Sequence, residues 1–283
     1  MKRNLLAILT LALLTSSVAN AAVIREFLPL PVTTTPGEWY LSDMRGAGTA
    51  SIPDLTGLGG DLETNQPLPT GAALLTTDFN NGDKAEVGTF GNFGLAADVL
   101  TTGQIGYDYY KQTVASGNAS AAPSIKLTLF AAGGTGDNFG TLVYEPTWNQ
   151  PSGGSSIVPA DAWQSVSIDS TTGSTDGTGT GGWWWTGGFG EANTAGGPPI
   201  RSLGEWASLF AANDPADFPN AQVVGISVGV GTFNQGQVGY FDKVSLSVPG
   251  GYNETFDFQA IPEPTSLALL GLGSLAMVTR RRR

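Results

Sequence analysis

The 283-residue chain contains no cysteine and no histidine. Without cysteine it has no disulfide bond, no thiol nucleophile and no cysteine-ligated zinc. Without histidine it lacks Ser-His-Asp and Cys-His catalysis, imidazole metal ligands and the commonest general base of enzymes. Chemistry in this chain therefore rests on carboxylates, hydroxyls, amides, amines and aromatic rings.

Basic residues are also scarce, with 13 Lys and Arg against 24 Asp and Glu. Six of the basic residues lie at the two ends of the chain, and only one acidic residue lies there, so the body between the ends has a net charge of about −16. Such a charge disfavours nucleic acid and anionic membrane surfaces as partners. It is compatible with calcium, with neutral glycans, or simply with solubility.

The N-terminus has the three parts of a secretory signal peptide. Lys2 and Arg3 are followed by an apolar run over 5–14, and Ala19 and Ala21 form an A-x-A cleavage site. This pattern predicts a signal peptide over residues 1–21, removed by signal peptidase, rather than a membrane-spanning helix. The mature chain is then expected to begin at Ala22.

The C-terminus, residues 261–283, also has three parts: Pro262-Glu263-Pro264, an uncharged apolar run over 266–278, and Arg280-Arg281-Arg282-Arg283. The two prolines keep the segment around Glu263 extended and poor in hydrogen-bond donors. Fifteen residues of helix span about 22 Å, less than the roughly 30 Å of a bilayer core. Local thinning and arginines that reach the headgroups make up the difference, and the arginines place the terminus on the cytoplasmic side.

This tail resembles a PEP-CTERM sorting signal, with Pro262, Glu263 and Pro264 matching the short motif and the four arginines matching the basic end. The resemblance implies recognition by an exosortase in the cytoplasmic membrane and cleavage near the motif. It also implies a bacterium that makes exopolysaccharide. We therefore expect export to the cell surface or extracellular matrix, with transient anchoring by the C-terminal helix.

The body, residues 22–260, is expected to be one all-β sandwich domain. Its 40 glycines and 17 prolines, counted over the whole chain, interrupt nearly every helical window and leave short Val, Ile, Thr and aromatic runs between turns. We expect strands over 39–41, 73–79, 85–90, 104–112, 124–130, 141–144, 163–168, 182–186, 223–230 and 239–248. One short helix is expected after Ser202, which has Glu205 three residues later as in a capping box.

The segment 239–246, Gly-Tyr-Phe-Asp-Lys-Val-Ser-Leu, resembles the last strand of jelly-roll modules of the carbohydrate-binding and galactose-binding type. The resemblance implies a jelly-roll-like sandwich.

Three consecutive tryptophans, Trp183, Trp184 and Trp185, stand among glycines. In an extended strand Trp183 and Trp185 point to one side and Trp184 to the other. Exposed indoles offer apolar platforms to the C–H faces of sugar rings, so these residues are candidate glycan contacts. The alternative is that one side of this strand fills the core and the other packs under a loop.

Hard oxygen ligands recur at Asp78, Asn80 and Asp83, and calcium takes six to eight such oxygens. Because Asp and Asn are also common turn formers, a plain turn is the alternative. Asp242 is a separate candidate for calcium or for a core hydrogen bond. No other cofactor is expected.

Glu145 lies between Tyr144 and Trp148, which places a carboxylate among aromatic rings. A glycosidase needs two carboxylates about 5 to 10 Å apart. Our leading hypothesis is a non-enzymatic surface or matrix protein that acts in adhesion or glycan association. The alternatives are a carboxylate-dependent enzyme acting on polysaccharide and a self-assembling structural protein.

Overall fold

The computed structural model describes residues 21–30, 37–132, 138–173, 182–191 and 196–261. Residues 1–20 of the expected signal peptide, including Ala19, lie outside this part of the chain, as do the sorting motif from Pro262 onward and the terminal arginines. Within the described residues, no helix is long and apolar enough to cross a membrane. The predicted membrane segment over 266–278 is not among them.

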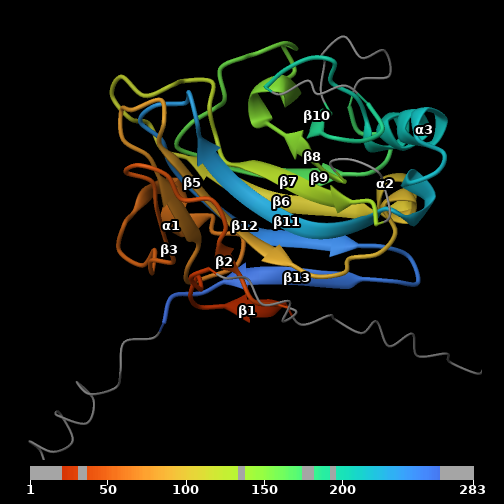
Figure 1. The fold of residues 1–283 in the computed structure, drawn as a ribbon. Coiled ribbons are helices and arrows are strands. Elements are labelled where there is room, and N and C mark those ends of the chain that lie inside the picture. The colour runs from red at the N-terminus through yellow and green to blue at the C-terminus, as the bar shows by residue number, and fades with distance from the viewer. Residues whose placement is uncertain (1–20, 31–36, 133–137, 174–181, 192–195, 262–283) are drawn as a thin grey trace, which may run out of the picture.

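The described body is a sandwich of two sheets, as predicted (Figure 1). Sheet A has seven strands: β1 (Ala22–Ile24), β3 (Thr49–Ser51), β4 (Ala73–Thr76), β6 (Gln104–Lys111), β9 (Trp163–Ile168), β12 (Val238–Ser247) and β13 (Asn253–Phe258). Sheet B has six strands: β2 (Tyr40–Leu41), β5 (Lys84–Phe90), β7 (Ser124–Phe130), β8 (Phe139–Tyr144), β10 (Trp184–Gly187) and β11 (Gln222–Gly231).

The strand order is that of a jelly roll. Sheet A contains the run β4-β12-β6-β9, and sheet B contains β5-β11-β7-β8. The chain changes sheet at most of its connections, namely β1 to β2, β2 to β3, β4 to β5, β5 to β6, β6 to β7, β8 to β9, β9 to β10 and β11 to β12. By contrast, β7 and β8 form a hairpin within sheet B. Eight strands arranged in this way make the double-sheet jelly roll, in agreement with the resemblance at 239–246.

The strands predicted on either side of residues 80–83 form, β4 in sheet A and β5 in sheet B. One detail of the strand predictions is corrected. The segment 239–246 lies in β12, which is not the last strand. β13 follows it and places Phe256 and Phe258 in the core beside Trp39, at ring distances of 5.3 and 4.9 Å.

The predicted helix is α3 (Leu203–Asn213), and its capping box is present, with Ser202 accepting from the Glu205 amide. The structure adds α1 (Gly60–Thr64), α2 (Ala96–Thr102) and the 3-10 turns η1 (Pro146–Asn149) and η2 (Phe218–Asn220). Figure 1 shows α2 and α3 together at one end of the sandwich and α1 toward the other. These helices close the ends of the core without changing its all-β class.

The two ends of the body are joined in sheet A. β1 pairs in parallel with β13, with Val23 opposite Asp257, and the Arg25 side chain donates to the Ala260 carbonyl at 3.0 Å. The first strand after the expected cleavage site therefore forms the sheet edge next to the strand that leads into the sorting tail.

Candidate functional site

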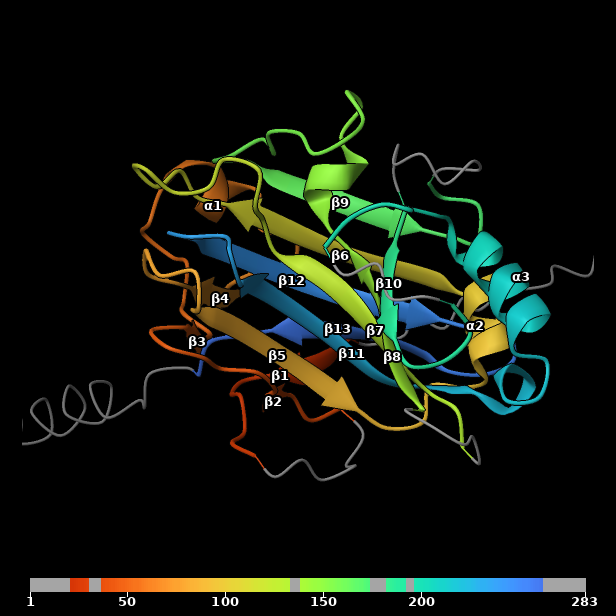
Figure 2. The same ribbon diagram turned by 45° about the horizontal axis from the view of Figure 1, so that its top comes forward.

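The outer face of sheet B carries the polar side chains of four neighbouring strands. In β7 the residues Ile125, Leu127 and Leu129 are buried in the core, so Lys126 points to the other face. The same alternation places Lys84 and Glu86 of β5 on that outer face. Sheet B is the sheet nearer the viewer in Figure 2.

A cavity of about 540 Å³ lies on this face. Its floor includes Lys84, Lys126 and Gly229, and its walls are three segments between strands: 118–122, 145–148 and 231–234. This volume is within the range of about 300–1,000 Å³ found for small-molecule sites. Residues from distant parts of the chain thus meet in one cavity on the outer face of sheet B.

Two indoles stand in the cavity wall and share one acceptor. The Nε1–H groups of Trp148 and Trp184 each donate to Oε2 of Glu145 at 3.0 Å. Trp148 belongs to η1, which begins directly after Glu145, and Trp184 belongs to β10. Because a carboxylate is a strong acceptor, the two rings are held in fixed orientations while remaining partly exposed at the cavity.

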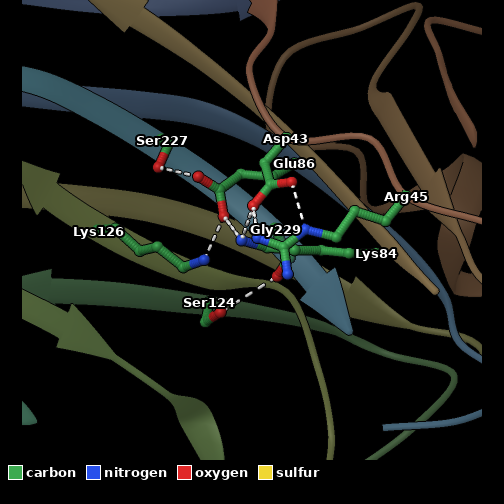
Figure 3. Close-up of polar contacts among 8 residues, drawn as sticks. All are labelled: Asp43, Arg45, Lys84, Glu86, Ser124, Lys126, Ser227 and Gly229. Carbon is green, nitrogen blue, oxygen red and sulfur yellow. Dashed lines mark hydrogen bonds and ion pairs between the residues drawn. The ribbon is translucent and has the colours of Figure 1, made fainter. Parts of the chain in front are cut away.

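The two floor lysines, Lys84 and Lys126, belong to an ionic network that is drawn in Figure 3. Lys84 Nζ lies 2.7 Å from Asp43 Oδ2 and 2.9 Å from Glu86 Oε2, and Lys126 also pairs with Glu86. Burial alone raises the pKa of Glu86, but the pairs with Lys126 and Lys84 outweigh it and lower the pKa to about 2. Glu86 is therefore ionised throughout the physiological range, and together with Asp43 it balances the charges of the two floor lysines.

Small side chains on β11 make room for this network. The Ser227 hydroxyl donates to Glu86 Oε1 at 3.0 Å. A Cβ at Gly229 would lie 3.1 Å from three atoms of the Glu86 side chain, which is closer than ordinary packing allows. Gly229 thus lets Glu86 lie flat across β11, between the two lysines.

The 118–122 wall is held in place by hydrogen bonds from Lys111, the last residue of β6. Its buried ammonium donates to the carbonyls of Asn118, Ala119 and Ala121 at 2.7, 2.6 and 2.6 Å. Burial lowers the pKa of Lys111 to about 8, so the amine keeps its proton at neutral pH. One charged group therefore fixes the shape of a whole segment of the cavity wall.

The three predicted tryptophans separate as the strand alternation requires. Trp183 and Trp185 are both 0% exposed and belong to the core, so they are corrected from candidate glycan contacts to packing residues. Trp185 lies against Phe210 of α3 at a ring distance of 4.7 Å. Trp184 alone of the three faces the cavity.

The candidate calcium residues form a hydrogen-bonded turn. Asp83 is buried and accepts from the amides of Ala47 and Asp78, at 3.1 and 3.2 Å, and Asn80 accepts from the Gly82 amide at 2.9 Å. No cluster of three or more acidic side chains suited to a metal ion occurs in the part of the chain that the structure describes. The Asn80 oxygen thus forms an Asx turn, and the Asp83 oxygens tie this turn to the backbone at 47 and 78.

Asp242 is fully buried and serves the core. Its carboxylate accepts from the amides of Leu68 and Phe258, both at 3.1 Å, and burial raises its pKa to about 8. Its role is the core hydrogen bond, the second of the two options open from the sequence.

Sequence reasoning missed two features of the site, the ionic floor and the rim residue Phe233, which also lines the cavity. In the ionic network, Glu86 contacts Lys126, which is 40 positions away in the sequence, and Ser227, which is 141 positions away. No local sequence pattern therefore marks the network. Trp148 was not among the candidate glycan contacts, but it lines the wall.

Residues 260–283 match the family model described as the PEP-CTERM protein-sorting motif. The chain carries a PEP-CTERM sorting signal. The protein is therefore an exported exosortase substrate, held in the membrane transiently at its C-terminus before processing and ending at the cell surface. No curated protein matches the chain in sequence.

Among solved structures, the chain is similar to a family 11 carbohydrate-binding module from Clostridium thermocellum in complex with a β-1,3-1,4-mixed-linked tetrasaccharide. The identity is 10%, the TM-score is 0.35, and the match covers 76% of this chain and 87% of the module. A second is TmCBM61 in complex with β-1,4-galactotriose, at 10% identity and a TM-score of 0.32, covering 76% of this chain and 90% of that one.

A third similar structure is an exo-β-agarase, at 11% identity and a TM-score of 0.35, with 72% of this chain matched. The chain spans only 23% of the length of that agarase.

Proposed function

We propose that this exported sandwich is a non-enzymatic surface or matrix protein that binds glycans in the cavity on the outer face of sheet B. The observation that carries the proposal is the pair of indoles, Trp148 and Trp184, bound to one oxygen of Glu145 beside a polar floor. Fixed aromatic faces suit the C–H faces of sugar rings, and hydroxyls, amides and ammonium groups suit their hydroxyl groups.

The cavity lining argues for binding rather than hydrolysis. Glu145 is the one carboxylate among the described residues that line it. Glycoside hydrolysis of the usual kind needs a pair of carboxylates facing the scissile bond. Glu86 is not among the lining residues but is ion-paired with both floor lysines. Its pKa of about 2 makes it unsuited to donate a proton near neutral pH.

Export supplies the setting for such a site. A sorted surface protein meets polysaccharide outside the cell, and we propose the exopolysaccharide as its partner. Adhesion to this matrix would follow from the binding, with the sorting signal delivering the sandwich to the surface.

Calorimetric titration of the purified full-length chain with a panel of soluble polysaccharides tests the proposal. The panel contains a β-1,3-1,4-glucan, a galactan, a galactomannan, polygalacturonate and alginate. We expect at least one to bind, and Trp184→Ala to weaken that binding about tenfold, equivalent to about 1.4 kcal/mol. Leu58→Ala, an exposed apolar residue outside the cavity, is the control and leaves binding unchanged.

Binding that Trp184→Ala does not weaken would place the ligand elsewhere. No heat of binding and no quenching of tryptophan fluorescence with any polysaccharide would instead favour a self-assembling structural protein. Release of sugars from a polysaccharide, lost in Glu145→Gln, would favour an enzyme.

A further inference from the structure

Phe233 is the most exposed large apolar side chain of the described residues, at 78% of its surface, and it lines the same cavity as Trp184. Its backbone lies in the left-handed region, with φ 61°. A bulky residue is uncommon in this region, because its side chain crowds the neighbouring backbone there. Because the ring is exposed, it also contributes little hydrophobic stabilisation to the folded state. Folding alone therefore gives no reason for a phenylalanine at this position.

The loop that carries Phe233 is held on both sides. The Phe233 amide donates to the Asn81 carbonyl at 2.9 Å, and the next residue, Asn234, accepts from the Asn118 side chain at 2.8 Å. The Gly236 amide also donates to the Asp78 carbonyl at 2.9 Å. The ring is thus presented to solvent at the cavity rim by a fixed backbone rather than by a loose loop.

The charges of the cavity indicate which class of ligand fits. Lys84 and Lys126, the basic residues among its described lining, are both ion-paired to Glu86. Glu145 adds a negative charge in the wall, and the body of the protein has a net charge of about −16. A polyanionic chain would be repelled over most of this surface, whereas an uncharged chain would not.

We propose that Phe233 is a second ring platform and that the site takes an uncharged polysaccharide, with one sugar at Trp184 and another part of the same chain on Phe233. This inference rests on the proposed function and gives it a ligand class. It also assigns a specificity role to a rim residue.

The test compares Phe233→Gly with the unchanged full-length protein, using the β-1,3-1,4-glucan, galactan and galactomannan as uncharged probes. Polygalacturonate and alginate are the charged probes, all at 0.15 M salt. We expect the uncharged polysaccharides to bind more tightly than the charged ones. We expect Phe233→Gly to weaken binding about tenfold without lowering the midpoint of thermal unfolding, because glycine adopts a positive φ without strain. Phe233→Tyr is expected to retain the binding.

Several results would overturn the inference. If Phe233→Gly binds as tightly as the unchanged protein while Trp184→Ala is weakened, the rim platform is wrong and the proposed function stands. If Phe233→Gly lowers the unfolding midpoint by several degrees, Phe233 is a structural residue. Tighter binding of polygalacturonate or alginate would refute the uncharged class, and binding of no polysaccharide would remove both the inference and the proposed function.

Discussion

Trp184 Nε1 donates to Glu145 Oε2 at 3.0 Å across 39 residues of sequence, and this bond joins β10 to the start of η1. Trp148 donates to the same oxygen at the same distance. One carboxylate thus orients two rings on the surface of sheet B. The proposed glycan site depends on this arrangement together with the ionic floor beside it.

The first prediction concerns acid. The pKa of Glu86 is lower in the folded state than the usual 4.5, so its ion pairs stabilise the fold fully above about pH 4.5. That stabilisation is lost as the pH falls toward 2. Urea unfolding at pH 6 and pH 3 measures it, and we expect the free energy of unfolding to fall less between these values in Glu86→Gln. Equal falls in both proteins would contradict the ion-pair account.

The second prediction concerns Lys111. Lys111→Met leaves three carbonyls of the 118–122 wall without their donor, the one of Ala121 being buried, and we expect the free energy of unfolding to drop by about 3 kcal/mol. Lys243→Met is the matched control, because Lys243 is half exposed and lies 3.8 Å from Asp108. It is expected to change stability by less than about 0.5 kcal/mol. Equal effects of the two substitutions in urea unfolding would show that the 118–122 wall does not need Lys111.

The third prediction concerns the packing of β8 against β10. A Cβ at Gly140 would lie 1.8 Å from a ring atom of the buried Trp185, so Gly140→Ala must displace that ring. We expect a loss of about 2 kcal/mol or more. At Gly91 a Cβ meets nothing within 4 Å, and Gly91→Ala is expected to be neutral. Thermal unfolding of the two variants measures the difference, and a stable Gly140→Ala would refute the packing of Trp185 against this strand.

Much of the fold could be predicted from local pattern. The alternation in 124–130 and the capping box at Ser202 are short-range signals, and both elements form where they were expected. The alternation of the three tryptophans also divides them correctly. It does not reveal which face is the core, because that depends on how β10 pairs with β8.

The site was harder to predict from the sequence than the fold was, because its contacts join residues that are far apart in the chain. Glu145 stood out between two aromatic residues, but its bond to Trp184 depends on the jelly-roll strand order. The same holds for Glu86 with Lys126 and Ser227. Phe233 lies in a short polar loop, where nothing local distinguishes a displayed ring from a packed one.

The fourth prediction concerns processing of the tail. An exosortase substrate is expected to lose the segment after Pro264, so the mature protein in the extracellular fraction ends near that residue. Mass spectrometry of the native protein checks this, with no peptide from Leu267 onward expected. An intact Arg280–Arg283 end in the membrane fraction would show a permanent anchor instead.

The most direct test of the glycan site is an NMR titration of the indole N–H signals of the seven tryptophans with the polysaccharide panel. The account predicts that an uncharged polysaccharide shifts the signals of Trp148 and Trp184, while those of the buried Trp39 and Trp206 stay in place. Shifts confined to Trp163, which packs against Tyr110 on sheet A, would contradict it. Unchanged positions of all seven signals with every polysaccharide would contradict it equally.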